Sequence, residues 1–230
     1  MIHKIATILL AILLMPATLS AQRAGDILTE REIEQKGIDR FFVKEKINDR
    51  LFKRIYGKSY KHGCTIPTAD LRYLRLLHYT IDHKIKVGEL ICNKNIADDL
   101  VDIFRQLFNA KYPIERMQLV DDYNADDNLS MEHNNTTCFN YRVVAGSKKL
   151  SKHSTGNAID INPLYNPYVK RRNDGSTTVN PKSGRKYADR SKKFNYKIDR
   201  NDLAYKLFTR HGFRWGGAWR TLKDYQHFEK

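Results

Sequence analysis

Residues 151–162 read Ser-Lys-His-Ser-Thr-Gly-Asn-Ala-Ile-Asp-Ile-Asn and place a histidine and an aspartate on either side of a glycine. If residues 158–162 form a strand, its period of two puts the isoleucines on the core face and Asp160 on the other. Gly156 permits a tight turn that can bring His153 back over Asp160. One nitrogen and one oxygen could then share a zinc ion, although a hydrogen-bonded pair is the alternative for these two residues alone.

The C-terminal segment adds a second pair of such residues. Asp224 and His227 stand three residues apart in an aromatic-flanked segment, where a turn or bulge before a final strand can aim both into one cleft. A catalytic zinc takes three protein ligands and one water, with a carboxylate nearby that is not a ligand. The pattern therefore predicts His153, Asp160 and His227 as ligands of Zn²⁺, and Asp224 as the catalytic base.

These two motifs carry a resemblance. Ser-x-His-x-x-Gly-x-Ala-x-Asp at 151–160, followed by Asp-x-x-His at 224–227, resembles the zinc D-alanyl-D-alanine carboxypeptidases and L-alanyl-D-glutamate endopeptidases, which cut peptidoglycan stem peptides. The similarity covers roughly residues 71–229 and includes Phe139-Asn140-Tyr141-Arg142, the segment 162–168 and Trp215-Gly216-Gly217-Ala218-Trp219. The vancomycin-resistance dipeptidases place Glu where this chain has Asp224. The chain therefore looks closer to the carboxypeptidase and endopeptidase branches.

The resemblance implies a zinc-activated water that attacks an amide carbonyl next to an alanine. Zinc can bring the pKa of bound water to about 7, which makes hydroxide available at neutral pH. Asp224 would take the proton of the water and pass it to the leaving amine. We expect a zinc metallopeptidase of the D-Ala-D-Ala carboxypeptidase type. The alternatives are L-alanyl-D-glutamate endopeptidase activity and a non-catalytic zinc-containing cell-envelope binding protein, although such binding proteins tend to lose the base.

Four further residues are expected at the substrate. Arg142 resembles the family's substrate-facing arginine, and its forked donors would bind a peptide carboxylate or the developing oxyanion. A surface salt bridge is the alternative for this arginine. Ser151 is expected to contact the substrate or the metal shell. Trp215 and Trp219 are expected to wall the cleft, with a place in the core as the alternative.

Composition and charge limit the classes of protein to which the chain can belong. The 230 residues are 41% hydrophobic, which suffices for one substantial core. The 41 Lys and Arg against 26 Asp and Glu give a formal charge of +15, so anionic cell-envelope polymers are candidate partners beside the stem peptide. Clustered nuclease carboxylates and aromatic-basic motifs are not evident, so no specific nucleic-acid partner is expected.

Residues 1–21 have the pattern of a signal peptide. Lys4 precedes an apolar run at 5–15, and small residues follow Pro16. The run is shorter than the roughly 20 residues that a transmembrane helix needs. We expect a periplasmic or secreted monomer with no transmembrane segment after cleavage.

The three cysteines leave two readings open. Cys64, Cys92 and Cys138 have no CxxC spacing, which disfavours a cysteine zinc site. Two of them could form a disulfide in an exported protein, or all three could be buried thiols.

The patterns along the chain predict a single α+β domain, in which a small antiparallel sheet carries the zinc site and helices pack on one face. An N-terminal helical extension at 22–70 would pack on a zinc peptidase domain at 71–230. The expected elements are a hairpin with strands at 76–82 and 84–92, a helix at 96–108 capped by Asn95, strands at 117–120 and 138–144, a long polar loop at 121–137, a surface excursion at 163–197, and a last helix at 202–211.

Overall fold

A long hairpin forms the centre of the larger sheet. The structure, a computed structural model, describes residues 22–144 and 147–230, so the predicted signal peptide at 1–21 lies outside the described residues. Strands β3 (Leu71–Tyr79) and β4 (Ile85–Asn93) pair in antiparallel register along their whole length. The predicted hairpin is therefore present, with a first strand that begins earlier than its sequence pattern indicates.

The N-terminal segment supplies both helices and edge strands. Helices α1 (Glu30–Lys36) and α2 (Asp49–Ile55) match the predicted helical character, and η1 (Ile38–Phe41) lies between them. Strands β1 (Ile27–Leu28) and β2 (Val43–Lys46) were not expected; they complete a sheet of order β1-β4-β3-β2. Both are short. Strand β2 is charged and largely exposed, which suits an edge strand, and it therefore lacks the alternation of apolar and polar residues by which a strand is predicted.

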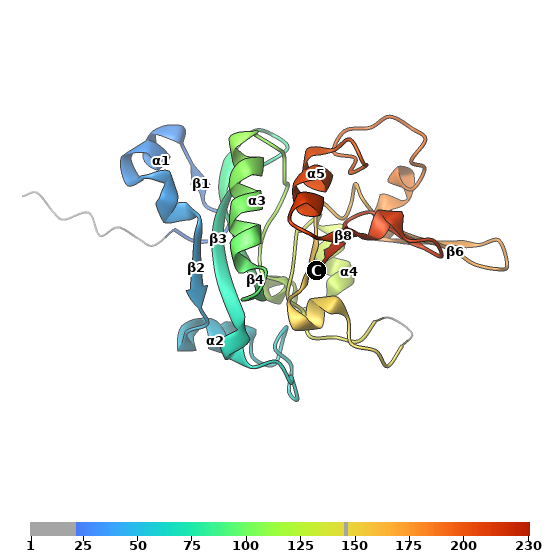
Figure 1. Ribbon diagram of the computed structural model, residues 1–230, viewed down its shortest axis with the longest axis horizontal. Coiled ribbons are helices and arrows are strands. Elements are labelled where there is room, and N and C mark those ends of the chain that lie inside the picture. The colour runs from blue at the N-terminus through green and yellow to red at the C-terminus, as the bar shows by residue number, and fades with distance from the viewer. Residues whose placement is uncertain (1–21, 145–146) are drawn as a thin grey trace, which may run out of the picture.

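Helix α3 (Ala97–Asn109) lies across one face of this sheet, as Figure 1 shows. Its apolar stripe is buried, so the predicted helix is confirmed. The predicted Asn95 cap is wrong: the N-cap is Ile96, without a side-chain hydrogen bond. The Asn93 side chain instead accepts from the Asn95 backbone at 3.0 Å, which forms a local turn before the helix.

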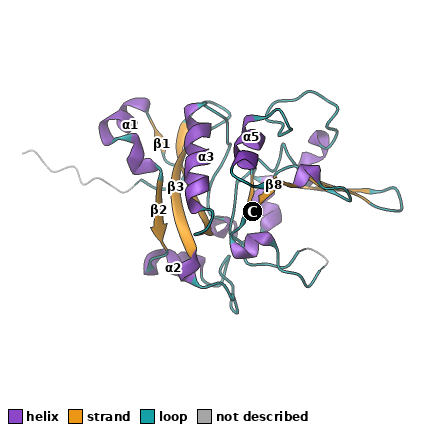
Figure 2. Ribbon diagram, viewed as in Figure 1, coloured by secondary structure: helices purple, strands orange, loops and turns teal. Residues whose placement is uncertain are grey.

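The C-terminal half is built from short elements around two small sheets (Figure 2). Helix α5 (Leu203–Arg210), predicted from the sequence, packs beside α3. One sheet has the order β5-β10-β8 and the other β7-β6-β9. The bounds are β5 (Ala158–Asp160), β6 (Tyr168–Arg171), β7 (Thr177–Asn180), β8 (Arg214–Trp215), β9 (Lys223–Asp224), β10 (His227–Glu229), α4 (Asp127–Glu132), η2 (Thr68–Asp70), η3 (Val120–Tyr123), η4 (Lys152–Thr155), η5 (Lys182–Tyr187) and η6 (Gly216–Ala218).

Several sequence expectations in this half are wrong. Residues 117–120 do not form a strand, and the polar segment 121–137, expected as a loop, contains η3 and α4. The surface excursion at 163–197 is present, with β6, β7 and η5 inside it. Residues 138–144 form no regular strand either. Consecutive amides there donate to the carbonyls of Ile91 in β4, His153 in η4 and Ser59 in the turn after α2, so no continuous ladder forms.

One core joins the two halves. The main cluster of buried side chains includes Leu28 from β1, Phe104 from α3 and Phe228 from β10, so the chain forms a single α+β domain, as predicted. All three cysteines are free thiols, and Cys92 and Cys138 are buried. Among the described residues, none of the helices has the length and apolar character that a membrane crossing requires.

Candidate metal centre

His153 is held by the short turn η4. The Ser151 hydroxyl accepts from the His153 amide at 3.3 Å and so caps this turn. The His153 ring donates from Nδ1 to the Cys138 carbonyl at 2.6 Å. Because a carbonyl oxygen can only accept, this bond fixes the proton on Nδ1 and leaves Nε2 with a free lone pair.

Gly156 fixes where η4 sits on the sheet. It closes η4 with a φ of +70°, and a side chain at this position would bring a Cβ within 2.6 Å of the Asn93 backbone nitrogen. That nitrogen donates to the Gly156 carbonyl at 2.8 Å. The glycine of the sequence motif therefore permits both the left-handed turn and the close approach that docks η4 on the end of β4.

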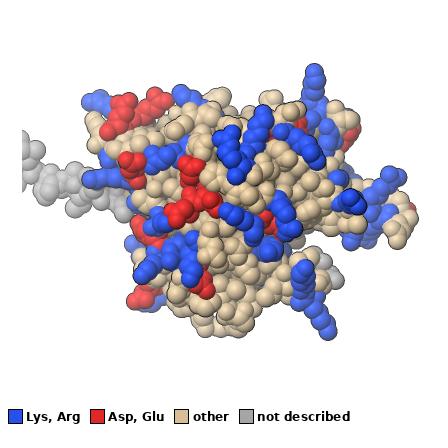
Figure 3. Space-filling model, in the orientation of Figure 1, with Lys and Arg blue, Asp and Glu red and all other residues tan. Residues whose placement is uncertain are grey.

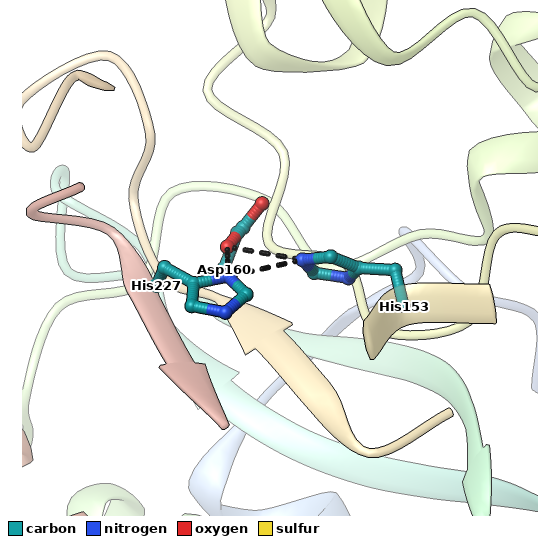
Figure 4. Close-up of side chains that lie close together, drawn as sticks. All are labelled: His153, Asp160 and His227. Carbon is teal, nitrogen blue, oxygen red and sulfur yellow. Dashed lines mark hydrogen bonds and ion pairs between the residues drawn. The ribbon is translucent and has the colours of Figure 1, made fainter. Parts of the chain in front are cut away.

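Asp160 and His227 come from neighbouring strands. Strands β5 and β10 pair with Asp160 directly opposite His227, so their side chains project from the same face. The His227 Nδ1 lies 3.0 Å from the Asp160 Oδ1, and the His153 Nε2 lies 3.3 Å from the same oxygen. The two histidine nitrogens are 3.2 Å apart. Figure 4 shows the three side chains converging from η4, β5 and β10.

The three ligand atoms match one face of a zinc tetrahedron. Their separations of 3.0, 3.2 and 3.3 Å define a nearly equilateral triangle. Tetrahedral zinc with bonds of about 2.0–2.1 Å requires ligand atoms about 3.3 Å apart. The three residues are buried, and these nitrogens and oxygen belong to the types that zinc prefers. The residues therefore fit a zinc ion without rearrangement of the backbone.

Glu229 supports His227 from its other side. Its Oε2 lies 3.4 Å from the His227 Nε2, and its Oε1 accepts from Arg214 at 2.8 Å. This contact favours a proton on Nε2 and leaves Nδ1 free to bind a metal. Glu229 was not among the residues predicted from the sequence. The signal was present, because residues two apart on a strand share one face.

The site is built to hold positive charge. Burial would raise the pKa of Asp160, but His153 and His227 hold it well below its usual range. Burial would lower the pKa of His227, but its hydrogen bonds to Asp160 and Glu229 raise it to about 10. Two carboxylates thus face His227 in a nearly solvent-free position. Such a group of ligand atoms favours a bound cation.

Asp224 lies on β9, close to this cluster. Its Oδ1 is shielded from solvent and has no hydrogen-bond partner among the described residues. Burial and the charge of Asp160 raise its pKa to about 6. Gly216 makes this approach possible, because a side chain there would bring a Cβ within 2.7 Å of the Asp224 carbonyl oxygen and 3.2 Å of the His227 Cβ. A carboxyl group of this kind can exchange a proton near neutral pH.

Arg142 is anchored beside η4. Its amide donates to the Ser154 hydroxyl at 2.9 Å, and its carbonyl accepts from the Ser151 amide at 3.0 Å. Its guanidinium forms an ion pair with Asp127 of α4 at 2.5 Å, while the buried Nε has no partner among the described residues. The arginine therefore has an anchor and a spare donor. Its contact with substrate stays a prediction.

The two tryptophans occupy different environments. Trp219 lies against the His227 ring, with 5.2 Å between ring centroids, and thus borders the metal centre. Trp215 is buried against Tyr205 and donates to the Tyr225 carbonyl at 2.9 Å. This places Trp215 in the core, the alternative that its sequence left open. The Ser151 hydroxyl caps η4 as described above, and its contact with substrate also stays a prediction.

Comparison with known proteins bears on the same part of the chain. A family model described as D-alanyl-D-alanine carboxypeptidase matches residues 145–230. The match includes the three converging residues and Asp224, and it supports a peptidase of the family that the sequence motifs indicate. Arg142 lies just outside the matched residues. No match was found among curated proteins or among solved structures.

Proposed function

We propose that the protein is a zinc-dependent peptidase that cleaves peptidoglycan stem peptides, foremost as a D-alanyl-D-alanine carboxypeptidase. One observation carries this proposal. Three buried ligand atoms from His153, Asp160 and His227 form the triangle that zinc requires, close to the Asp224 carboxyl, whose Oδ1 has no hydrogen-bond partner among the described residues. The family match over the same residues supports the substrate class. The predicted signal peptide supports a periplasmic or secreted location, where this substrate is found.

The chain's own residues then divide the work of hydrolysis. When bound, the metal supplies an activated water at neutral pH. The Asp224 carboxylate accepts a proton and returns it to the leaving amine nitrogen, for which a pKa near 6 is suited. The spare Nε of Arg142 can donate to the substrate carboxylate or to the developing oxyanion. Trp219 shields the His227 ring.

The direct test is cleavage of a defined substrate. The purified protein is incubated with a synthetic stem pentapeptide and with peptidoglycan, with and without a chelator, and the products are identified by mass spectrometry. Loss of the terminal D-alanine, abolished by chelator and by His153→Ala or Asp224→Ala, is expected. The matched control is His62→Ala, because His62 is exposed and far along the chain from the site motifs.

The other outcomes separate the alternatives. A cut after the first L-alanine would make the protein an endopeptidase of the same stem peptides. A folded, zinc-loaded protein that binds peptidoglycan but cleaves nothing would overturn the proposal in favour of a binding protein. Cleavage that persists in Asp224→Ala at the wild-type rate would refute the role of that carboxylate.

A further inference from the structure

A projecting basic arm lies next to the metal centre. We define the arm as residues 168–193, which include β6, β7 and η5. Its β6–β7 hairpin extends away from the body of the molecule (Figure 1). The arm contains nine Lys and Arg residues and two Asp, a net charge of +7 out of the chain's +15, within 26 of the 230 residues. The excess positive charge is therefore concentrated beside the site.

The protein itself leaves most of this charge unneutralised. Eight of the nine cationic residues are exposed: Lys170, Arg171, Arg172, Lys182, Arg185, Lys186, Lys192 and Lys193. Of these, Lys192 alone forms an ion pair among the described residues, with Asp189 at 3.8 Å. Lys and Arg side chains gather over the projecting hairpin in Figure 3. A low-dielectric body that projects like-signed charges attracts a polyanion at close range.

The base of the arm is anchored at the site. Strand β6 pairs with β9, with Tyr168 opposite Asp224, so the arm begins one strand away from the proposed base. On its other side, Asn180 donates to Asn128 of α4 at 3.0 Å, and Glu132 of α4 accepts from the Lys182 amide at 2.8 Å. These contacts fix the direction of the arm relative to the metal centre.

The ninth cation of the arm has an internal role. The Arg190 guanidinium donates to the carbonyls of Tyr165 and Ile198 at 2.9 and 2.8 Å, and it stacks over the Tyr225 ring at 4.3 Å. It therefore ties the arm to the segment that leads into His227. The exposed cations are not needed for these internal contacts and are free to bind a partner.

We propose that the basic arm binds carboxylate groups of the peptidoglycan polymer outside the bond that is cut, and so holds the insoluble substrate at the site. The polymer's identity rests on the proposed function. The end of β6 at Arg171 lies about 10 Å along the strand from Tyr168, the position opposite Asp224, at about 3.3 Å per residue, and the hairpin tip lies beyond it. Such a row of cations suits a polymer with repeated carboxylates. The tip sequence from Lys170 to Ser176 has no aromatic residue, so it lacks the stacking surfaces of single-strand nucleic-acid binders.

The test is co-sedimentation with insoluble peptidoglycan across a salt series. All proteins carry Asp224→Ala and are zinc-loaded, so that the polymer stays intact. The arm variant is K170Q/R171Q/R172Q, and the matched control is K46Q/R50Q/K53Q, which removes the same charge from exposed residues of β2 and α2. Three exposed charge contacts worth about twofold each predict a Kd raised roughly tenfold for the arm variant and less than twofold for the control.

Two further readouts identify the ligand groups. Amidation of the peptidoglycan carboxylates should abolish arm-dependent binding. With the unmodified polymer, 0.5 M NaCl should weaken this binding, because the Debye length falls to about 4 Å at that salt concentration. Equal loss in both charge variants, or tighter arm-dependent binding to duplex DNA than to peptidoglycan, would overturn the proposal. Cleavage is measured separately in the protein with Asp224 intact. A failure of the arm therefore leaves the proposed activity standing, and a failure of cleavage with arm-dependent binding intact would refute the activity alone.

Discussion

The sheet region, residues 22–119, and the site region, residues 120–230, treat buried polar groups in opposite ways. In the sheet region the buried Glu89 carboxylate accepts two hydrogen bonds from Arg54, at 2.5 and 2.8 Å, and one from Tyr73 at 2.9 Å. In the site region, five buried side-chain polar atoms lack hydrogen-bond partners, although others there are paired. Among the described residues, these are Asn134 Nδ2, Asn140 Oδ1, Arg142 Nε, Asp224 Oδ1 and Gln226 Oε1, against Arg75 Nε alone in the sheet region.

The difference shows which region is built for stability and which for chemistry. An unpartnered buried polar group costs about 1–3 kcal/mol, so it persists where a ligand or a reaction makes use of it. The sheet region instead gains its free energy from apolar burial between β3, β4 and α3. Mutations should therefore separate metal binding and activity from stability along this boundary.

The largest effect is expected for His227→Ala in the site region. Removal of one of the three proposed ligands should abolish stoichiometric zinc binding and lower hydrolysis of the stem pentapeptide by roughly 10³-fold or more. Metal content by mass spectrometry and the initial rate measure both. Zinc retained at one equivalent, with full activity, would show that the triangle is not the metal site.

Phe104→Ala should have the opposite profile. Phe104 is 1% exposed and packs edge-on against Phe208 in the main core. Its truncation should lower the free energy of unfolding by about 3–5 kcal/mol. The zinc affinity of the folded protein should stay unchanged. Urea denaturation measures the loss, and Leu129→Ala, at a 43% exposed position, should cost well under 1 kcal/mol. A large change in zinc affinity would contradict the separation of the two regions.

Glu229→Ala tests a residue that contacts a proposed metal ligand, His227, and is not itself among the proposed ligands. Loss of its contact with His227 should weaken zinc binding by about 10- to 100-fold, as measured by competition with a chelating dye. Glu229→Gln keeps an acceptor and should recover part of the affinity. Glu45→Ala, an exposed residue of β2, is the control for loss of a carboxylate. Wild-type affinity in Glu229→Ala would remove Glu229 from the site.

The smallest effect is a pH dependence in the sheet region. His78 is buried and contacts the Ile114 carbonyl at 2.7 Å, and burial lowers its pKa to about 4. Its pKa in the unfolded chain is about 6.5, so below that pH the unfolded state binds the proton first. The stability present above pH 6.5 is then lost as the pH falls toward 4.

Urea denaturation at pH 7 and pH 5 measures this effect. The wild type should lose about 1–2 kcal/mol more than His78→Asn over this interval. Groups elsewhere titrate in both proteins, so they cancel from the difference. An identical pH dependence in the two proteins would show that His78 is protonated at no cost in the folded state.

Local patterns allowed several elements to be predicted. The 3.6-residue period of apolar side chains is a property of one helix, so α3 and α5 could be located from their own residues. The β3–β4 hairpin joins neighbouring segments and was likewise evident. The segment 138–144 could not be assigned correctly, because its backbone hydrogen bonds go to three separate segments, β4, η4 and the turn after α2, whose positions no local pattern encodes.

The site divides in the same way. The spacing of His153, Gly156 and Asp160 around one turn and one strand was enough to predict the residues that could share a metal. Their geometry depends on the fold, because Asp160 and His227 lie 67 residues apart and meet through the register of β5 and β10. The tertiary structure likewise brought Asp127 to Arg142 and packed Trp215 into the core. Periodicity is fixed within an element, whereas contacts between elements depend on how their faces pack.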